Sequence, residues 1–260
     1  MQLSSASALT IAGFDNSGGA GVLADIRTFR KFGVYGVAVI TAIAVQNTQR
    51  VYEVFPLPSR VVRKELEVLF EDINIQGVKI GMLANSEITE EIYNFFKERN
   101  VEFIVLDPVF RSKSGKTLLD EEGIEVLKEK LIKLTYLITP NVPEAEILCG
   151  KKINTIEDVY KCAKIIKGLG AENVLIKGGH LEGEISIDIL YDGKDFYEFK
   201  AKRIKGKKPR GTGCVFSSAI LANLIKGAQL KKAVETAKEF ITEAIDNSVK
   251  IGKGYEVMIF

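Results

Sequence analysis

Charged and polar side chains follow several short apolar runs in the sequence. These residues are Asp107, Asn141 with Glu144, and Lys177. If the runs are parallel strands, their carboxyl ends meet at one edge of a sheet, where open α/β proteins bind ligands. Two acids at such an edge could hold Mg²⁺ through water, which this ion prefers to keep. A lysine beside them would attract an anionic ligand.

Each of these residues also has a purely structural interpretation. Asn141 can cap a helix that Pro143 opens, and Glu144 is then an acid in the first turn, where the helix dipole favours it. Lys177 can extend from a buried strand end to solvent. The sequence leaves both interpretations open.

A glycine pair stands directly before an apolar helical segment, in Gly211-Thr212-Gly213-Cys214. The first amides of a helix lack partners within it and lie at the positive end of the dipole, which favours phosphate binding. The same surroundings can lower the pKa of the Cys214 thiol from about 8.5 into a range of about 3.5–7.5. An ordinary glycine cap with a packing cysteine is the alternative.

A basic run precedes this turn. Seven of the residues 200–210 are Lys or Arg and none is acidic. Without them the chain has 29 basic and 34 acidic residues, a net charge of −5 against +2 for the whole. The run is either a solvated positive strand and loop or an anion-facing loop, and the glycine turn after it favours the second. The nearly neutral total gives no general attraction to nucleic acid.

Two other glycine motifs resemble nucleotide-binding fingerprints but lack essential parts. Gly19-Ala20-Gly21 fits a dinucleotide fingerprint, yet the next strand ends without the acid that would bind a ribose hydroxyl. A tight turn that lets a flat ligand approach the backbone explains these glycines better. The segment 114–117 imitates the end of a P-loop, but Phe110 stands where that motif needs its first glycine.

The composition excludes several classes of protein. With 46% hydrophobic and 27% charged residues in 260, the chain is typical of a globular protein and can bury about three quarters of its unfolded surface. One histidine, His180, and no Gly-x-Ser-x-Gly motif argue against a serine hydrolase, and the ligands of a zinc site are missing. Three cysteines do not make a disulfide framework, so we expect a reducing compartment, the cytoplasm. No signal peptide, membrane span or membrane partner is expected.

The elements that position these residues alternate between strands and helices. Predicted strands cover 9–12, 37–45, 51–55, 78–80, 103–106, 136–138 and 174–176, with a hairpin at 187–191 and 196–200. Predicted helices cover 18–32, 59–72, 87–97, 121–133, 143–148, 156–167, 213–225 and 231–249. This order favours an α/β fold with three layers, α/β/α, and a mostly parallel central sheet with an antiparallel edge hairpin. No linker or repeat divides residues 1–260, so we expect one domain.

The ordered motifs resemble, almost from end to end, the hydroxymethylpyrimidine/phosphomethylpyrimidine kinases of thiamine biosynthesis, which have the ribokinase-like fold. The matching blocks are Leu9-Thr10-Ile11-Ala12-Gly13, Asp15, Ser17-Gly18-Gly19-Ala20-Gly21, Ala24-Asp25, Val45-Gln46-Asn47-Thr48, Lys79-Ile80-Gly81-Met82-Leu83, Asp107-Pro108-Val109, Lys113-Ser114-Gly115, Ile138-Thr139-Pro140-Asn141, Glu144-Ala145, Lys177-Gly178-Gly179-His180 and Gly211-Thr212-Gly213-Cys214. The chain departs from the family at Phe14, Asn16, Arg210 and Val215, where Ser, Pro, His and Thr are common.

The resemblance implies a role for each candidate residue. Gln46 would hydrogen-bond the edge of the pyrimidine ring. The remaining substrate contacts would be Gly13, Asp15, Ala20, Met82 and Val109. ATP would be bound by Asp107, Asn141, Glu144, Lys177 and Thr212, with Mg²⁺ held by Asp107 and Glu144 through water. The catalytic group would be Lys177, Gly211, Thr212, Gly213 and Cys214, with the thiol where other ribokinase-like enzymes carry an aspartate base.

The activity implied is ATP-dependent phosphorylation of hydroxymethylpyrimidine and of its monophosphate, by a cytoplasmic homodimer. The sequence leaves two alternatives open. The first is a pyridoxal kinase on the same fold, although Gln46 favours the pyrimidine. The second is a regulatory protein that binds a pyrimidine without catalysis.

Overall fold

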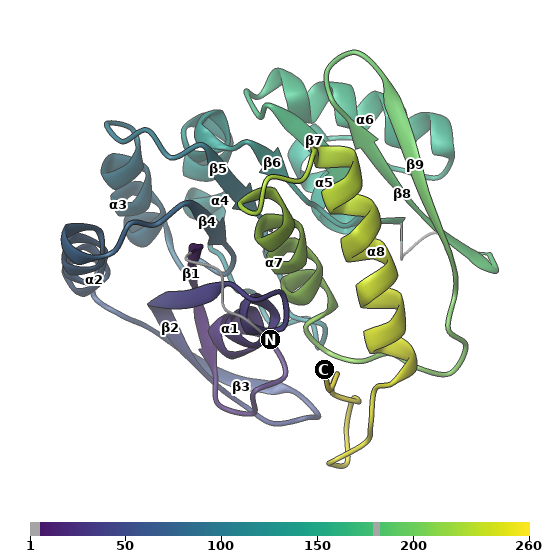
Figure 1. Ribbon diagram of the computed structural model, residues 1–260, viewed down its shortest axis with the longest axis horizontal. Coiled ribbons are helices and arrows are strands. Elements are labelled where there is room, and N and C mark those ends of the chain that lie inside the picture. The colour runs from purple at the N-terminus through teal and green to yellow at the C-terminus, as the bar shows by residue number, and fades with distance from the viewer. Residues whose placement is uncertain (1–5, 179–182) are drawn as a thin grey trace.

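The computed structural model describes residues 6–178 and 183–260, and in this part the strands form one sheet in the order β3-β2-β1-β4-β5-β6-β7-β8-β9 (Figure 1). The strands are β1 (Ser7–Asp15), β2 (Tyr35–Gln46), β3 (Val51–Pro56), β4 (Gly77–Ile80), β5 (Phe103–Leu106), β6 (Leu137–Ile138), β7 (Asn173–Ile176), β8 (Ile185–Tyr191) and β9 (Phe196–Lys202). The predicted motif residues Gly179 and His180 lie outside the described residues.

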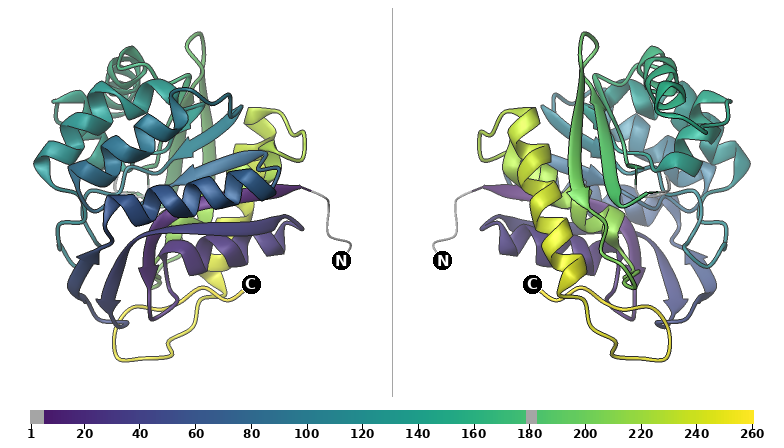
Figure 2. Two further views of the ribbon diagram at one scale, coloured as in Figure 1. Left: turned by 90° about the vertical axis from the view of Figure 1, so that its left-hand side faces the viewer. Right: turned by 90° about the vertical axis from the view of Figure 1, so that its right-hand side faces the viewer.

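Helices cover both faces of the sheet. They are α1 (Gly21–Lys31), α2 (Ser59–Asp72), α3 (Ser86–Phe96), α4 (Glu121–Glu129), α5 (Val142–Cys149), α6 (Ile156–Gly168), α7 (Thr212–Leu224) and α8 (Leu230–Asp246), with a 3₁₀ turn at Leu131–Leu134. Helices α1, α7 and α8 lie on one face and α2 to α6 on the other, as the side views show (Figure 2). The predicted three-layer fold is confirmed.

The central strands are parallel and aligned in register. Ile80 of β4 lies beside Leu106 of β5, Leu106 beside Ile138 of β6, and Ile138 beside Val174 of β7. The segments that follow these strands therefore leave the sheet at the same edge. The predicted antiparallel hairpin is β8 with β9. A second antiparallel edge, β3 against β2, was not predicted.

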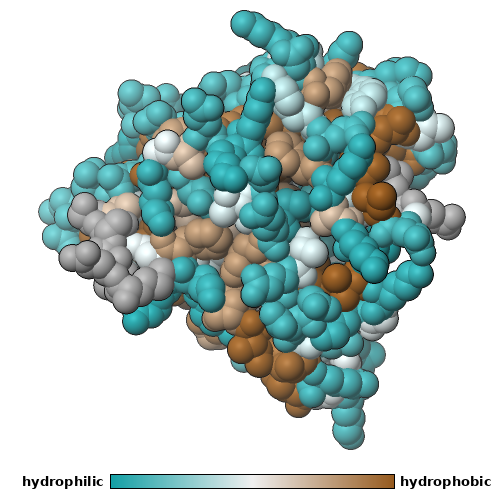
Figure 3. Space-filling model, turned by 45° about the vertical axis from the view of Figure 1, so that its right-hand side comes forward, coloured by the Kyte–Doolittle hydropathy of each residue, from teal (hydrophilic) through white to brown (hydrophobic). Residues whose placement is uncertain are grey.

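Each layer of helices has its own apolar core. Phe95, Leu66 and Ile92 belong to the core on the α2–α6 side, whereas Phe29 and Ile220 belong to the core on the other side. Strands buried on both faces explain the continuous apolar runs of the sequence. On the face in Figure 3, hydrophilic side chains cover most of the surface and apolar residues form separate patches. No described helix is long and apolar enough to span a bilayer.

Some helix boundaries differ from those predicted, because local turns replace helix. Helix α1 begins at Gly21 rather than at 18, since Gly18 adopts a left-handed turn with φ 73°. The predicted helix 121–133 ends at Glu129 and continues as the 3₁₀ turn. Helix α8 ends at Asp246, three residues early.

The sequence predicted no disulfide framework from its three cysteines, and this prediction missed one disulfide. Cys149 at the end of α5 and Cys162 within α6 form a disulfide, with their Cα atoms 5.5 Å apart. Both residues are buried, while Cys214 is a free thiol. Counting cysteines cannot reveal that two packed helices bring two of the three together.

Candidate functional site

A cavity of about 840 Å³ lies at the edge of the sheet where the parallel strands end. It is lined by every residue that the sequence analysis assigned to a site: Gly13, Asp15, Ala20, Gln46, Met82, Asp107, Val109, Asn141, Glu144, Lys177, Gly211, Thr212, Gly213 and Cys214. Aligned strands collect these residues, which are up to 201 positions apart in the sequence. The structure therefore brings the predicted residues together at one edge of the sheet.

One end of the cavity, which we call the ring end, is built from β1, β2 and the glycine loop between β1 and α1. Gln46 is the last residue of β2 and is 8% exposed. Gly21 has φ 59°, and a Cβ atom there would lie 2.1 Å from the carbonyl oxygen of Gly13. The loop therefore folds closely on itself as only glycine allows, and this brings backbone to the cavity wall.

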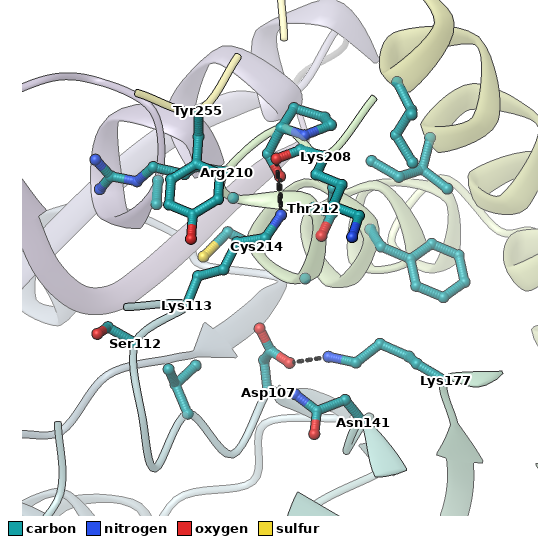
Figure 4. A pocket seen from close by; sticks show the side chains of 18 of the residues that line it. Asp107, Ser112, Lys113, Asn141, Lys177, Lys208, Arg210, Thr212, Cys214 and Tyr255 are labelled. Atoms are coloured by element: carbon teal, nitrogen blue, oxygen red, sulfur yellow. Dashed lines mark hydrogen bonds and ion pairs between the residues drawn. The ribbon is translucent and has the colours of Figure 1, made fainter. Parts of the chain in front are cut away.

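The opposite end, which we call the phosphate end, contains a buried ion pair. The Lys177 Nζ atom donates to Asp107 Oδ1 at 2.5 Å (Figure 4). Asp107 is 2% exposed, and Thr139 Oγ1 lies 3.4 Å from the same oxygen. Burial opposes the charge on Lys177, but Asp107 and Glu144 outweigh it and raise the pKa of this lysine. Lys177 is therefore a permanent cation at the sheet edge.

Asn141 and Glu144 form a reciprocal cap at the start of α5. Glu144 N donates to Asn141 Oδ1 at 3.0 Å, and Asn141 N donates to Glu144 Oε2 at 2.8 Å. The structural interpretation is thus correct, yet both residues also line the cavity. Burial raises the pKa of Glu144 to about 7, with Lys177 lowering it and Asp107 raising it. Glu144 is therefore poised to change charge near neutral pH.

The turn before α7 presents free backbone amides to the phosphate end. Gly211 is the N-cap residue with φ 76°, and no side chain caps the helix. A Cβ atom on Gly211 would lie 2.1 Å from the carbonyl oxygen of Gly19, and one on Gly213 would lie 3.0 Å from Asp107 Oδ2 and 3.2 Å from Lys177 Nζ. The uncapped amides therefore lie beside the ion pair, an arrangement suited to binding phosphate.

The expected lowering of the Cys214 pKa is wrong in direction. Burial raises the pKa of the thiol to about 11, although the charge of Lys79 and a hydrogen bond from the Gly21 amide oppose this. Loss of hydration thus outweighs both favourable interactions. Cys214 is therefore a neutral thiol at physiological pH.

A fully buried ion pair near this thiol was not predicted as part of the site. Lys79 Nζ donates to Asp25 Oδ2 at 2.9 Å, and Thr10 and Ser218 donate to the same carboxylate. Both charged side chains are 0% exposed. Lys79 is the one charged residue of β4, and Asp25 and Lys79 both belong to the motif blocks of the sequence, but neither was given a role.

The cavity wall includes further residues that the sequence analysis did not assign. Lys113 Nζ donates to the carbonyl oxygens of Lys208 and Pro209 at 2.8 and 3.1 Å and lies 5.0 Å from the ring centre of Tyr255 (Figure 4). Burial, together with the charge of Lys208, lowers the pKa of Lys113. Apolar side chains of α7 and α8 line another part of the wall: Phe216, Ile241 and Ile245. These residues follow the ordinary apolar periodicity of a helix, so the sequence alone does not distinguish them from core positions.

The three-layer fold, with charged strand ends facing an uncapped helix start, defines the class of ribokinase-like small-molecule kinases. Two solved structures support this class. The phosphomethylpyrimidine kinase of Clostridium difficile is 44% identical with a TM-score of 0.82, covering 92% of this chain and 99% of that one. The pyridoxal kinase of Staphylococcus aureus in complex with AMP-PCP and pyridoxal is 35% identical with a TM-score of 0.90, covering 98% and 93%.

Sequence comparison narrows the class to one family. The family model for phosphomethylpyrimidine kinase matches residues 15–258. The hydroxymethylpyrimidine/phosphomethylpyrimidine kinase of Aquifex aeolicus is 69% identical over 253 residues, which cover 97% of this chain and 99% of the relative. The chain therefore belongs to the phosphomethylpyrimidine kinase family.

Proposed function

We propose that this protein is a phosphotransferase that uses ATP to phosphorylate 4-amino-5-hydroxymethyl-2-methylpyrimidine, and then its monophosphate to the pyrophosphate, in thiamine biosynthesis. One observation carries the proposal: a single cavity joins a ring-binding end to a phosphate-binding end. Direct transfer of a phosphoryl group requires the two substrates to lie next to each other in one site. We also propose that residues 1–260 work as one kinase domain.

At the ring end, we assign Gln46 to the edge of the pyrimidine, because a side-chain amide suits an aminopyrimidine. Gly13, Ala20, Met82 and Val109 would contact the flat ring. Met82 lies directly against Gly13, since its Sδ atom would be only 2.8 Å from a Cβ on that glycine, so the two residues form one continuous part of the cavity wall. We assign Asp15 to the same end, as support for the glycine loop.

At the phosphate end, we assign Asp107, Asn141, Glu144, Lys177 and Thr212 to the phosphates of ATP. Lys177 would attract the γ-phosphate, and the amides of residues 211–214 would donate to its oxygens as charge develops. These donors are fixed by the fold, so they need little rearrangement during transfer. Phe216, Ile241 and Ile245 would contact the nucleoside, because they offer the apolar part of the same wall.

We assign Mg²⁺ to Asp107 and Glu144. No group of three or more metal-binding side chains occurs within the described residues. Two carboxylates fit an ion that takes its other ligands from water and phosphate oxygens. When bound with the nucleotide, Mg²⁺ would neutralise charge on the phosphates.

We place Cys214 at the hydroxyl that receives the phosphoryl group. A thiol with a pKa of about 11 does not remove that proton before attack. In a largely dissociative transfer the hydroxyl proton leaves late, so positioning and electrostatics supply most of the rate. We expect Cys214→Ala to lower kcat strongly while the pyrimidine KM stays within about tenfold.

We further propose a homodimer. Ile43 and Val45 of β2 are 42% and 41% exposed, and Phe55, which pairs with Ile43 across the strands, is 53% exposed. These three apolar side chains share one sheet face, which a second copy would cover. Sedimentation should show a dimer for the natural chain and a monomer for Phe55→Glu. A monomeric natural chain would exclude the dimer.

We propose the cytoplasm as the location, because ATP is available there. The Cys149–Cys162 disulfide is compatible with this proposal, since both residues are buried and soluble thiols reach them poorly.

The decisive experiment measures ADP release by the purified protein with hydroxymethylpyrimidine, with its monophosphate and with pyridoxal. We expect turnover of both pyrimidines, each depending on Mg²⁺, and a lower kcat/KM for pyridoxal. Dominant turnover of pyridoxal would favour a pyridoxal kinase instead. Calorimetric binding of the pyrimidine without ADP release would indicate a regulatory protein.

A further inference from the structure

One arginine connects the turn at the phosphate end to the ring end of the cavity. Arg210 directly precedes the glycine turn, and its side chain is 10% exposed. Its Nη2 atom donates to Asp15 Oδ2 at 3.0 Å and to Gln46 Oε1, and its Nη1 atom donates to the carbonyl oxygen of Asn47 and, at 3.4 Å, to Ser17 Oγ. In Figure 4, Arg210 lies at the upper left, above Asp107, whereas Lys177 lies at the lower right. The hydrogen-bond partners of the guanidinium all belong to the ring end and the loops beside it.

The position of the guanidinium is fixed by a saturated carboxylate. Asp15 is 2% exposed and accepts hydrogen bonds from Ser17 N at 2.8 Å, Ser17 Oγ at 2.7 Å and Ala20 N at 2.9 Å, besides that from Arg210. These contacts leave Asp15 little capacity to bind a ligand. The Asp15 carboxylate instead holds the Arg210 guanidinium in contact with Gln46.

This contact determines which way the Gln46 amide faces. A guanidinium only donates hydrogen bonds, so the atom of Gln46 that touches Arg210 must be its oxygen. Among the described residues, Nε2 of Gln46 has no hydrogen-bond partner, and Gln46 lines the cavity. The amide is therefore locked with its N–H donor available to a ligand.

We propose, on the basis of the proposed kinase function, that Arg210 is a specificity-determining positioning residue. It holds Gln46 so that the enzyme offers a hydrogen-bond donor to the ring edge of its substrate. An aminopyrimidine suits this donor, because its ring nitrogens carry lone pairs and accept hydrogen bonds. A heterocycle with a ring N–H at the same place sets donor against donor and is rejected.

The first test separates this role from simple structural support. In Arg210→Met, Gln46 is free to rotate, and we expect the pyrimidine KM to rise about tenfold or more while the ATP KM stays within about threefold. Arg210→Lys keeps a donor and should give an intermediate KM. Arg63→Met is the matched control, since Arg63 forms its ion pairs with Glu67 and Glu91 on the outer surface. An unchanged pyrimidine KM in folded Arg210→Met would overturn the proposal.

Arg210→Met also leaves the buried Asp15 carboxylate without its cation, which can prevent folding. The double variant Asp15→Asn/Arg210→Met removes both charges, so no buried carboxylate is left unpaired and the kinetics can still be measured. Gln46→Glu is independent of this problem, because it keeps the cation and removes only the donor. At pH 8 we expect Gln46→Glu to raise the pyrimidine KM about tenfold or more and to shift preference toward a pyrimidinone with a ring N–H. No shift in preference would contradict the proposal.

Substrate analogues provide a second readout on the natural chain. Replacing the accepting ring nitrogen by C–H should weaken binding about tenfold or more, and removing the amino group should weaken it less. The reverse order would overturn the proposal while leaving the kinase assignment intact. If the natural chain does not phosphorylate hydroxymethylpyrimidine at all, the proposed function itself fails, and the inference fails with it.

Discussion

The two ends of the cavity hold charged groups in different ways. At the ring end, Asp15 and Arg210 satisfy each other and the surrounding backbone. At the phosphate end, burial raises the pKa of Glu144 to about 7 and that of Cys214 to about 11, and the amides before α7 lack capping side chains. At the ring end the charges are satisfied by the protein itself and the Gln46 N–H is left as a donor, whereas at the phosphate end amides and acids have capacity left for an anion and a metal.

This difference indicates that the two ends of the cavity have different functions. A saturated network fixes the direction of a few donors, which is what recognition of a flat neutral ring requires. The uncapped amides before α7 can bind an anion, and an acid with a raised pKa, Glu144, is stabilised in its charged form when a metal ion binds beside it. Phosphoryl transfer requires both kinds of group. Substitutions at the ring end should therefore change KM for the pyrimidine, and substitutions at the phosphate end should change kcat.

The largest effect should come from Lys177→Met. This change removes the buried cation beside the amide turn and leaves Asp107 unpaired. We expect kcat to fall by about 10² to 10³-fold, while KM for the pyrimidine changes by less than about threefold. Steady-state kinetics with each substrate varied in turn would measure this, with Lys130→Met, at a surface ion pair with Glu90, as the control. A large rise in the pyrimidine KM would remove the distinction between the two ends.

The second largest effect should come from the disulfide that supports the phosphate end through α5. The Cys149–Cys162 disulfide ties α6 to α5, whose first turn carries Asn141 and Glu144. Closing a loop across 13 positions should stabilise the fold by about 3 kcal/mol. We expect Cys149→Ala/Cys162→Ala to lower the free energy of unfolding in urea by about this amount.

A thiol reductant provides the control for the disulfide. Because the disulfide is buried, the reductant is present throughout the urea unfolding and refolding, so that it reaches the cysteines of the unfolded chain. It should then destabilise the natural chain similarly and leave the double variant unchanged. Because the reciprocal cap is local, the ATP KM should change by less than about threefold. Equal stability of the natural chain with and without reductant would contradict a contribution from the disulfide.

A smaller effect is expected in the reactivity of Cys214. Because burial raises its pKa, the protonated form dominates at pH 8, and the thiolate fraction is about 10²-fold below that of a free cysteine with a pKa of about 8.5. Alkylation by iodoacetamide, followed by mass spectrometry, should accelerate tenfold per pH unit until about pH 11. A plateau below pH 9 would show instead that the helix start dominates over burial.

The sequence predicted the positions of the site better than its energetics. Parallel strands bring their ends together whatever their neighbours are, so Asp107, Asn141 and Lys177 could be grouped from pattern alone. The pKa of Cys214 depends on how much water the folded chain excludes from it, which no local pattern encodes. The contact of Arg210 with Gln46 joins positions 164 apart, and the basic run around Arg210 pointed only to an anion.

The smallest effect tests whether Asn141 serves the site or only the helix. Asn141 and Asn85 cap α5 and α3 with the same geometry, each accepting from the third residue on, at 3.0 and 2.9 Å. Replacement of either by Ala should cost about 1 kcal/mol of stability. Only Asn141 lines the cavity, so only Asn141→Ala should also lower kcat/KM for ATP, by about tenfold. Thermal unfolding with ATP kinetics on both variants would decide. Equal kinetics would make Asn141 a helix cap alone and confine the phosphate end to Asp107, Glu144, Lys177 and the turn before α7.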